Sequence, residues 1–240
     1  MKETLTVISP VYNEEEAIKE FYDELSGVLS KISHRYECNI LFIVDKGTDA
    51  SWQILKSIAE QDISVQLILL SSRFGHQMSL MAGIDNSNSD IIVMLDSDLQ
   101  HPPSLIPQML CEYEKGYDIV YTIRQDSSET SFAKRFVSKL FYSIINRTSN
   151  ITINESAADF RLVSYRVAEV FRKQIRERNQ SLRGLFSWVG FSSIGIRFRV
   201  RKRRAGKSKY SFGRMFQFGI DGMLSFSRKP LKAAIYLGLA

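Results

Sequence analysis

Five largely apolar runs alternate with amphipathic segments over the first 125 residues, and this alternation constrains the fold more than any other feature. The runs lie at 5–9, 40–44, 65–70, 90–95 and 117–122. Runs of this kind are typical of strands buried on both faces of a sheet. The segments between them place apolar residues three and four positions apart, as helices packed on a sheet do. The alternation predicts an α/β fold with a mostly parallel, doubly wound sheet flanked by helices.

Polar residues follow each of these expected strands. They lie at 10–14, 45–49, 71–76, 96–100 and 124. The carboxyl ends of parallel strands meet along one edge of a sheet, which is where ligands bind in this architecture. We therefore expect the five clusters to gather into one site.

Asp96-Ser97-Asp98 is the cluster with the clearest chemical meaning. In an extended chain, residues i and i+2 face the same side, so Asp96, Asp98 and Gln100 would bring three oxygens to one point. Such oxygens suit a Mg²⁺ or Mn²⁺ ion that also binds substrate phosphates. The alternative is a strand end with solvated aspartates. His76 and His101 flank the site without a metal-ligand spacing, and we expect ordinary turn histidines there.

Positive charge is concentrated in the last quarter of the chain. Residues 178–220 hold eleven Lys or Arg and no Asp or Glu, whereas the whole chain has a net charge of +6. The remainder is therefore net negative. A basic surface of this kind fits phosphorylated substrates, an anionic membrane or nucleic acid, with a merely solvated charged face as the alternative.

The second half of the chain has weaker patterns. Residues 127–170 look helical and polar, with 159–162 interrupting that region. From Ile194 to Arg201, apolar residues alternate with arginines, which predicts a strand with one charged face. A basic loop follows. Residues 211–229 then fit an amphipathic helix, lying either in a membrane interface or on the domain, and 230–240 fit the start of a truncated transmembrane segment.

The chain resembles the inverting family 2 glycosyltransferases of GT-A fold. Within them it is similar to the polyprenyl-phosphate transferases, such as bactoprenol glucosyltransferase and dolichyl-phosphate mannose synthase. The matching stretches occur in the family's order and cover nearly the whole chain. They are Ser9–Glu15, Ser72–Gly75, Ala82–Asp85, Asp96–Pro103, Asp159–Leu162, Glu177–Asn179, Gly184–Gly190 and Ala205–Tyr210.

The resemblance implies transfer of a hexose from a nucleotide sugar to a polyprenyl phosphate at the cytoplasmic face of a membrane. UDP-glucose is the first expectation for the donor and undecaprenyl phosphate for the acceptor. The implied domains are a GT-A domain at 1–210, with a nucleotide-sugar half at 1–125 and an acceptor half at 126–210. The interfacial helix at 211–229 and the membrane segment at 230–240 would follow. The sequence leaves open whether the chain forms a homo-oligomer, and a nucleic-acid partner is not expected.

The resemblance also implies roles for residues. Pro10, Tyr12, Glu14, Asp45 and Lys46 would line the nucleotide pocket, and Asp96, Asp98 and Gln100 would hold the metal and the donor diphosphate. The acceptor phosphate would meet the basic residues Arg124, Lys134, Arg135, Arg203 and Lys209. Asp98 and Asp159 are the catalytic candidates. We expect Asp159 to orient the sugar or an arginine rather than abstract a proton, with a structural pair to Arg161 as the alternative.

One departure from the family pattern lies at the second strand end. The family usually reads Asp-Asp-Gly-Ser-x-Asp there, whereas this chain reads Asp45-Lys46-Gly47-Thr48-Asp49. A lysine reverses the charge where an acid commonly contacts the nucleoside. A catalytically impaired relative that binds nucleotide or lipid phosphate is therefore a rival interpretation. Two rivals that do not depend on this position are a family 2 transferase with a soluble glycan acceptor and a basic nucleic-acid-binding module.

Overall fold

The computed structural model describes residues 2–125, 157–176 and 182–199 of the 240-residue chain. The chain forms two compact units. The first comprises residues 1–125, 158–176 and 191–206, and the second comprises 126–157, 177–190 and 207–240. In the second unit the structure describes helix α7, Leu182–Trp188, in which Trp188 is exposed. The predicted domain boundaries stay predictions.

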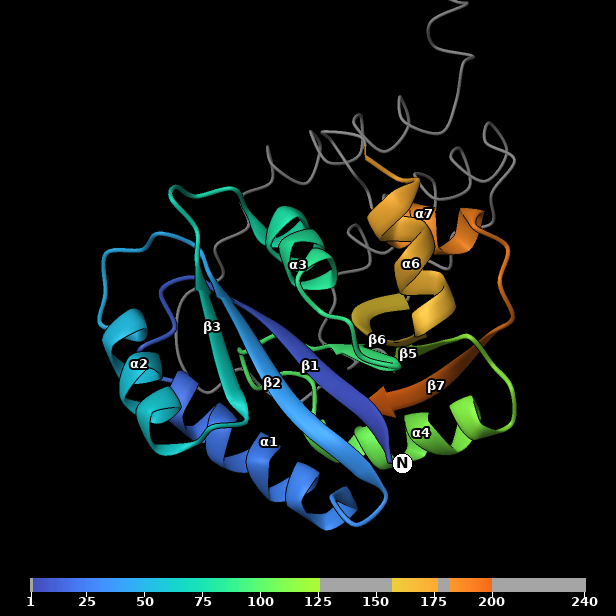
Figure 1. The fold of residues 1–240 in the computed structure, drawn as a ribbon, viewed down its shortest axis with the longest axis horizontal. Helices are drawn as coiled ribbons and strands as arrows, with labels where there is room; N and C mark the ends of the chain where they lie inside the picture. Colours follow the sequence, from blue (N-terminus) through green and yellow to red (C-terminus); the bar gives the residue numbers. More distant parts are fainter. Residues whose placement is uncertain (1, 126–156, 177–181, 200–240) are drawn as a thin grey trace, which may run out of the picture. The chain divides into compact units, whose positions relative to one another are not determined.

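The first unit is built on a seven-stranded sheet in the order β3-β2-β1-β4-β6-β5-β7 (Figure 1). Strands β1, β2, β3 and β4 pair in parallel, as do β5 and β7, and β6 runs antiparallel to β4. The prediction of a mostly parallel α/β sheet is confirmed. The strands are β1 Glu3–Val11, β2 Tyr36–Val44, β3 Val65–Leu69, β4 Ile91–Met94, β5 Ile119–Gln125, β6 Ala157–Ser164 and β7 Ser193–Arg199.

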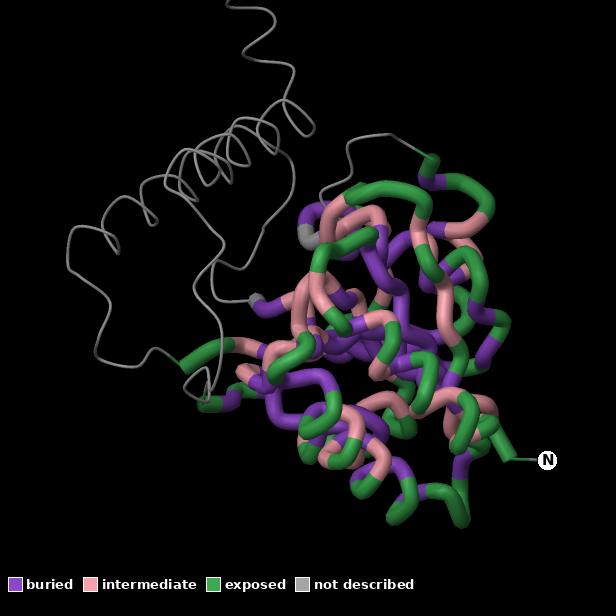
Figure 2. The backbone as a smooth tube through the Cα atoms, turned by 90° about the vertical axis from the view of Figure 1, so that its left-hand side faces the viewer, coloured by how far each residue is buried: buried purple, intermediate pink, exposed green. Residues whose placement is uncertain are grey.

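Helices cover both faces of this sheet (Figure 1). One face packs against α1 (Ile18–Ile32), α2 (Ser51–Gln61), the short 3₁₀ helix η1 (Pro103–Leu105) and α4 (Ile106–Glu114). The other face carries α3 (His76–Asp85) and α6 (Tyr165–Lys173), which contact β1, β2 and β4. Buried residues follow the central strands, and exposed residues lie on the outer surfaces (Figure 2).

Close packing of α3 on the sheet depends on a glycine. A Cβ atom on Gly83 would lie 2.3 Å from Cγ2 of Ile8, a fully buried β1 side chain. The missing side chain lets the helix backbone approach the strand. This contact fixes α3 against β1 and so places the amino end of α3 beside the carboxyl ends of the strands.

The expectation of a helical, polar segment at 127–170 is wrong for residues 157–164. These residues form β6, which lies between β4 and β5 with Met94 opposite Arg161 and Ile91 opposite Ser164. Phe160, Leu162 and Val163 are fully buried there. The polar residues at 159 and 161 hide the strand from a periodicity analysis, because Arg161 is itself buried within the sheet.

The predicted alternation at the start of the basic region is confirmed. In β7, Ile196 and Phe198 are buried, whereas Arg197 and Arg199 are exposed. Among the residues that the structure describes, no helix has the length and apolar character needed to cross a membrane. The predicted interfacial helix at 211–229 and the segment at 230–240 lie outside the described residues.

Candidate functional site

The site lies where β1, β2, β4 and β5 end and β6 begins, along one edge of the sheet (Figure 1). At the end of β4, Leu95 donates its N–H to the carbonyl oxygen of Ile8, so pairing with β1 continues by one residue. The chain then turns. Ser97 Oγ donates to the carbonyl oxygen of Pro10 at 3.0 Å, and Leu99 adopts a φ of 61°.

This turn changes the geometry expected for the acidic cluster. The prediction that Asp96, Asp98 and Gln100 line up on one side of an extended strand is wrong in its premise, since β4 ends at Met94 and a turn begins at Ser97. Within the turn, the N–H of Gln100 donates to Asp98 Oδ1 at 3.1 Å. Local hydrogen bonding, rather than strand geometry, therefore orients the Asp98 carboxylate.

Two histidines bracket the Asp96 carboxylate. His76 Nε2 lies 2.6 Å from Asp96 Oδ1, and His101 Nδ1 lies 3.7 Å from Asp96 Oδ2. Burial raises the pKa of Asp96, but His76, with smaller contributions from His101 and Arg124, outweighs burial and holds this pKa well below its usual range. Asp96 is therefore ionised at neutral pH. On the far side of His76, Gln77 Nε2 lies 3.1 Å from Nδ1.

His101 is buried between Asp96 and Arg124. Its ring lies against the rings of Phe160 and Phe198, with centroid separations of 5.9 and 5.4 Å. Arg124, at the end of β5, places Nη2 3.2 Å from His101 Nε2. Burial lowers the pKa of His101, and the Arg124 charge lowers it further against the opposing effect of Asp96, so the imidazole is held neutral.

Asp159 and Arg161 lie on the same face of β6, two residues apart. Arg161 Nη2 lies 3.8 Å from Asp159 Oδ1, and the same atom donates to the carbonyl oxygen of Ala158 at 3.2 Å. Arg161 is buried, whereas the Asp159 side chain keeps 20% of its surface exposed. Asp159 also raises the pKa of His101, which places its charge near that ring. The arrangement fits a carboxylate that is held by Arg161 and exposed to the site.

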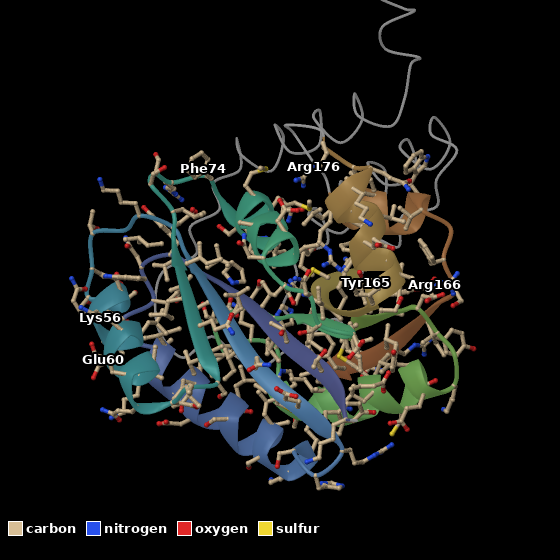
Figure 3. All side chains as sticks on the ribbon, in the orientation of Figure 1. Lys56, Glu60, Phe74, Tyr165, Arg166 and Arg176 are labelled. Carbon is tan, nitrogen blue, oxygen red and sulfur yellow. The ribbon has the colours of Figure 1, made fainter. Side chains whose placement is uncertain are left out.

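Asp45, at the end of β2, organises the loop between β3 and α3. This carboxylate is buried, and it accepts hydrogen bonds from the N–H groups of Phe74 at 3.1 Å and Gly75 at 2.9 Å. Gly75 has a φ of 88°, a conformation that favours glycine. Both Asp45 oxygens are thus used within the protein. They fix the loop from which Phe74 projects, 54% exposed (Figure 3).

The loop also places an arginine over an aromatic ring of the predicted nucleotide pocket. The guanidinium carbon of Arg73 lies 3.9 Å from the centroid of the Tyr12 ring, the geometry of a cation–π contact. Pro10 is the next-to-last residue of β1, Tyr12 directly follows the strand, and Asn13 turns the chain with a φ of 52°. The predicted Pro10 and Tyr12 therefore lie together at one strand end.

Residues 13–15 are joined by hydrogen bonds to residues 48–51, so the β1 and β2 loops form one surface. Asn13 Oδ1 accepts from the Thr48 N–H at 2.9 Å, and the Glu14 N–H donates to Ser51 Oγ at 2.8 Å. A Cβ on Gly47 would lie 2.2 Å from Asn13 Oδ1, so a larger residue there would displace the Asn13 side chain from this hydrogen bond. Lys46, the departure from the family pattern, is exposed on this surface.

The donor set of the site fits a metal ion only in part. Among the described residues, no group of three His, Cys, Asp or Glu side chains is assembled to hold a metal. The Asp96 and Asp98 carboxylates and the Gln100 amide still supply hard oxygens at one strand end. Mg²⁺ and Mn²⁺ commonly bind one or two carboxylates and take further ligands from substrate phosphates. The residues therefore fit an ion shared with a bound diphosphate.

The structure does not test four of the predicted site residues. Lys134, Arg135, Arg203 and Lys209 lie outside the described residues, so their roles stay predictions. Conversely, sequence reasoning assigned no role to Arg73, and it expected His76 and His101 to be ordinary turn residues. Their positions directly after predicted strands were the available signal, but the contacts with Asp96 depend on packing.

A separate hollow of about 320 Å³ lies among residues at the amino ends of β1, β4 and β5. Its carboxylates are already engaged. Asp90 accepts from the N–H and Oγ of Thr4, and Asp118 accepts from Ser164 Oγ at 2.8 Å. It lies at the end of these strands opposite the Asp96 cluster, so we do not assign it to the functional site.

Comparison with known proteins gives a consistent family. The sequence model described as glycosyl transferase family 2 matches residues 6–171. An uncharacterized glycosyltransferase of Bacillus subtilis, YkcC, is 37% identical over 98% of this chain and 72% of its own length. A prophage bactoprenol glucosyl transferase homolog of Escherichia coli is 35% identical over 98% of this chain and 76% of its own. A bactoprenol glucosyl transferase of Shigella phage SfV is 34% identical over the same shares.

Solved structures share the GT-A fold. Glucosyl-3-phosphoglycerate synthase from Mycobacterium tuberculosis, crystallised with Mn²⁺, UDP and phosphoglyceric acid, has a TM-score of 0.61 at 16% identity. That match covers 93% of this chain and 78% of the synthase. A mannosyltransferase from Pyrobaculum calidifontis, in complex with GDP-Man and Mn²⁺, has a TM-score of 0.58 at 14% identity and covers 87% and 59%. At these identities the likeness establishes the fold alone.

Proposed function

The chain belongs to glycosyl transferase family 2, and on that premise we propose that it transfers a hexose from a nucleotide sugar to a polyprenyl phosphate. The observation that carries the proposal is the combination of relatives and site. Relatives named bactoprenol glucosyl transferases match 98% of the chain. In addition, His101 lies between Arg124 and Asp96, which belongs to the acidic cluster proposed to bind the sugar donor. Glucose from UDP-glucose and undecaprenyl phosphate are the proposed donor and acceptor.

The donor would lie across the carboxyl ends of β1, β2 and β4. Tyr12 and Arg73 offer a flat, positively charged surface for the nucleotide, and the loop holding Arg73 is fixed by Asp45. Asp96 and Asp98, with Gln100, would hold a Mg²⁺ or Mn²⁺ ion and the donor diphosphate. Such an ion, when bound, neutralises the charge that develops on the leaving diphosphate.

The acceptor would be positioned rather than deprotonated. A phosphate monoester has a second pKa near ~6, so at neutral pH it is already largely anionic and nucleophilic. Its needs are alignment and partial neutralisation, which an arginine with forked N–H donors supplies. Arg124 is exposed at the end of β5 and suits this role, with Lys134, Arg135, Arg203 and Lys209 as further proposed contacts.

Asp159 would then orient the transferred sugar. In support of this role, its carboxylate lies 3.8 Å from the Arg161 guanidinium and keeps 20% of its surface exposed. Because the acceptor needs no general base, Asp159 would not have to remove a proton. Asp98 would be indispensable, since it is the half-buried carboxylate that the turn at Gln100 holds in place.

We further propose that the protein acts at the cytoplasmic face of a membrane. The acceptor class is a membrane lipid, and the basic residues beginning at Arg197 suit an anionic surface. The exposed arginines of β7 are the part of that basic region which the structure describes. A helix at 211–229 lying in the interface is part of the same proposal, as is a homo-oligomer.

The test is sugar transfer by the purified protein. UDP-glucose, UDP-N-acetylglucosamine, UDP-galactose and GDP-mannose would each be supplied with undecaprenyl phosphate in detergent, with and without Mn²⁺. We expect one donor to yield a sugar-lipid phosphate, and we expect Asp98→Asn to abolish it while the melting temperature is retained. Transfer to a soluble glycan without lipid would contradict the proposed acceptor. The absence of both transfer and donor hydrolysis with every donor would refute the enzymatic proposal.

A further inference from the structure

His101 stands between the residue proposed for the acceptor phosphate and the residue proposed for the donor. The imidazole is 1% exposed. Nε2 faces Arg124 Nη2 at 3.2 Å, and Nδ1 faces Asp96 Oδ2 at 3.7 Å. The aromatic rings of Phe160 and Phe198 flank it, with centroid separations of 5.9 and 5.4 Å. Each nitrogen of this buried imidazole therefore faces a residue with a proposed role in substrate binding.

The hydrogen bond to Arg124 decides which nitrogen of His101 carries the hydrogen. A guanidinium group donates hydrogen bonds and accepts none, so Nε2 must be the acceptor. A neutral imidazole then has its hydrogen on Nδ1, the atom that faces Asp96. Nδ1 makes no hydrogen bond to any described residue, and 3.7 Å is too long for one. The ring therefore holds an unused donor directed at the Asp96 carboxylate.

We propose that His101 is a positioning residue that couples the acceptor site to the donor site, so that each substrate strengthens binding of the other. The inference rests on the proposed function, which places the donor at Asp96 and the acceptor phosphate at Arg124. A phosphate bound by Arg124 restricts the guanidinium. The guanidinium in turn restricts the imidazole, and the imidazole directs Asp96 Oδ2 toward the donor.

The direction of the effect follows from the donors that Arg124 has available. The guanidinium has five N–H groups, so it can bind a phosphate and still donate to His101. Arg124 is exposed, and its long side chain loses conformational freedom when a phosphate holds it. A ligand that orders a shared network lowers the ordering cost for a second ligand, and the coupling is reciprocal. The expected cooperativity is therefore positive.

The test measures binding without turnover. UDP with Mn²⁺ is titrated into the full chain with and without a short-chain polyprenyl phosphate, and GDP replaces UDP if the transfer assay identifies a guanosine donor. UDP carries no sugar, so no product forms. In the unaltered protein we expect the lipid phosphate to tighten nucleotide binding about fivefold, the low end of common allosteric couplings. The converse titration should give the same factor.

Two His101 variants separate the two contacts. The His101→Gln side chain can keep an oxygen acceptor for Arg124 but has no donor at the position of Nδ1, so we expect nearly normal lipid-phosphate binding with the coupling factor reduced to about one. His101→Phe fills the space and removes both contacts, so both the affinity for lipid phosphate and the coupling should fall. The matched control is Phe198→Leu, which loosens packing on the same ring. It should lower the melting temperature and leave the coupling factor in place.

The inference is overturned if His101→Gln retains the fivefold factor, if Phe198→Leu abolishes it equally, or if the unaltered protein shows no coupling although both ligands bind. In the last case sugar transfer can still occur, so the proposed function survives. If no lipid phosphate binds the unaltered protein and none is glycosylated, the proposed function fails and the inference falls with it. Should His101→Phe fail to fold, His101→Gln alone decides the question.

Discussion

Replacing Asp45 with asparagine tests whether this carboxylate builds the site or contacts the donor. In the structure both of its oxygens accept backbone N–H groups, from Phe74 at 3.1 Å and from Gly75 at 2.9 Å. Asparagine keeps one acceptor oxygen and turns an NH₂ group toward the other backbone N–H. One hydrogen bond is therefore lost, and two hydrogen-bond donors face each other in its place. A hydrogen bond to a charged group contributes about 1.5–3 kcal/mol, and we expect a loss of about 2 kcal/mol.

The assay for Asp45→Asn is thermal unfolding combined with hydrogen exchange. For a chain of this size each kcal/mol shifts the melting temperature by about 2–4 °C, so the expected decrease is about 4–8 °C. The Phe74 and Gly75 amides should lose protection against exchange, because Asp45 is their hydrogen-bond acceptor. Donor affinity should fall as a consequence, since the same loop holds Arg73 over Tyr12.

The control for Asp45→Asn is the neighbouring exposed residue. Lys46→Gln should change the free energy of unfolding by no more than about 0.5 kcal/mol, as exposed substitutions usually do. The reasoning is refuted if Asp45→Asn leaves the melting temperature and the two amides unchanged while donor affinity falls. That result would mean that Asp45 contacts the nucleoside directly and does not support the loop.

Three further predictions concern other parts of the molecule. Gly83→Ala should destabilise the protein by about 1–3 kcal/mol in denaturant unfolding, because its methyl group would collide with a buried β1 side chain. Gly27→Ala, in a helix with open space around the same atom, should instead stabilise it by up to about 1 kcal/mol. The hydrogen bonds from Thr4 hold the pKa of Asp90 below its usual range. Its contribution to stability should thus be present above pH ~4 and lost as the pH falls further, and Asp90→Asn should flatten the acid limb of a stability–pH curve. Lys46→Asp restores the acid of the family pattern and should tighten nucleotide binding in calorimetry, whereas unchanged affinity would show that this position does not contact the nucleoside.

Local patterns were sufficient for most of the fold. The apolar runs located β1 to β5, and the arginine alternation located β7 with Ile196 and Phe198 inward. These features could be predicted because burial on one face or two imposes a periodicity that a short window of sequence contains. The polar residues after each strand likewise indicated the edge at which Asp45 and Asp96 lie.

Pairing between distant segments could not be predicted in this way. Strand β6 enters the sheet between β4 and β5 because Met94 pairs with Arg161, 67 positions later in the chain, and nothing in the short stretch 157–164 records that partner. Its two charged residues broke the apolar pattern of a central strand. Arg161 is tolerated there because its guanidinium finds Asp159 and the Ala158 carbonyl oxygen within the fold.

The sequence by itself determined strands β1 to β5 and β7, the helices between β1 and β5, and the acidic residues at the strand end, since these depend on local periodicity and residue chemistry. Only the tertiary structure decided how those residues are used. It turned Asp98 out of the extended line, enclosed Asp96 between His76 and His101, and directed both oxygens of Asp45 to a loop 29 and 30 residues away. The physical reason is that hydrogen bonds and burial depend on positions in space, and those positions follow from strand order and helix packing.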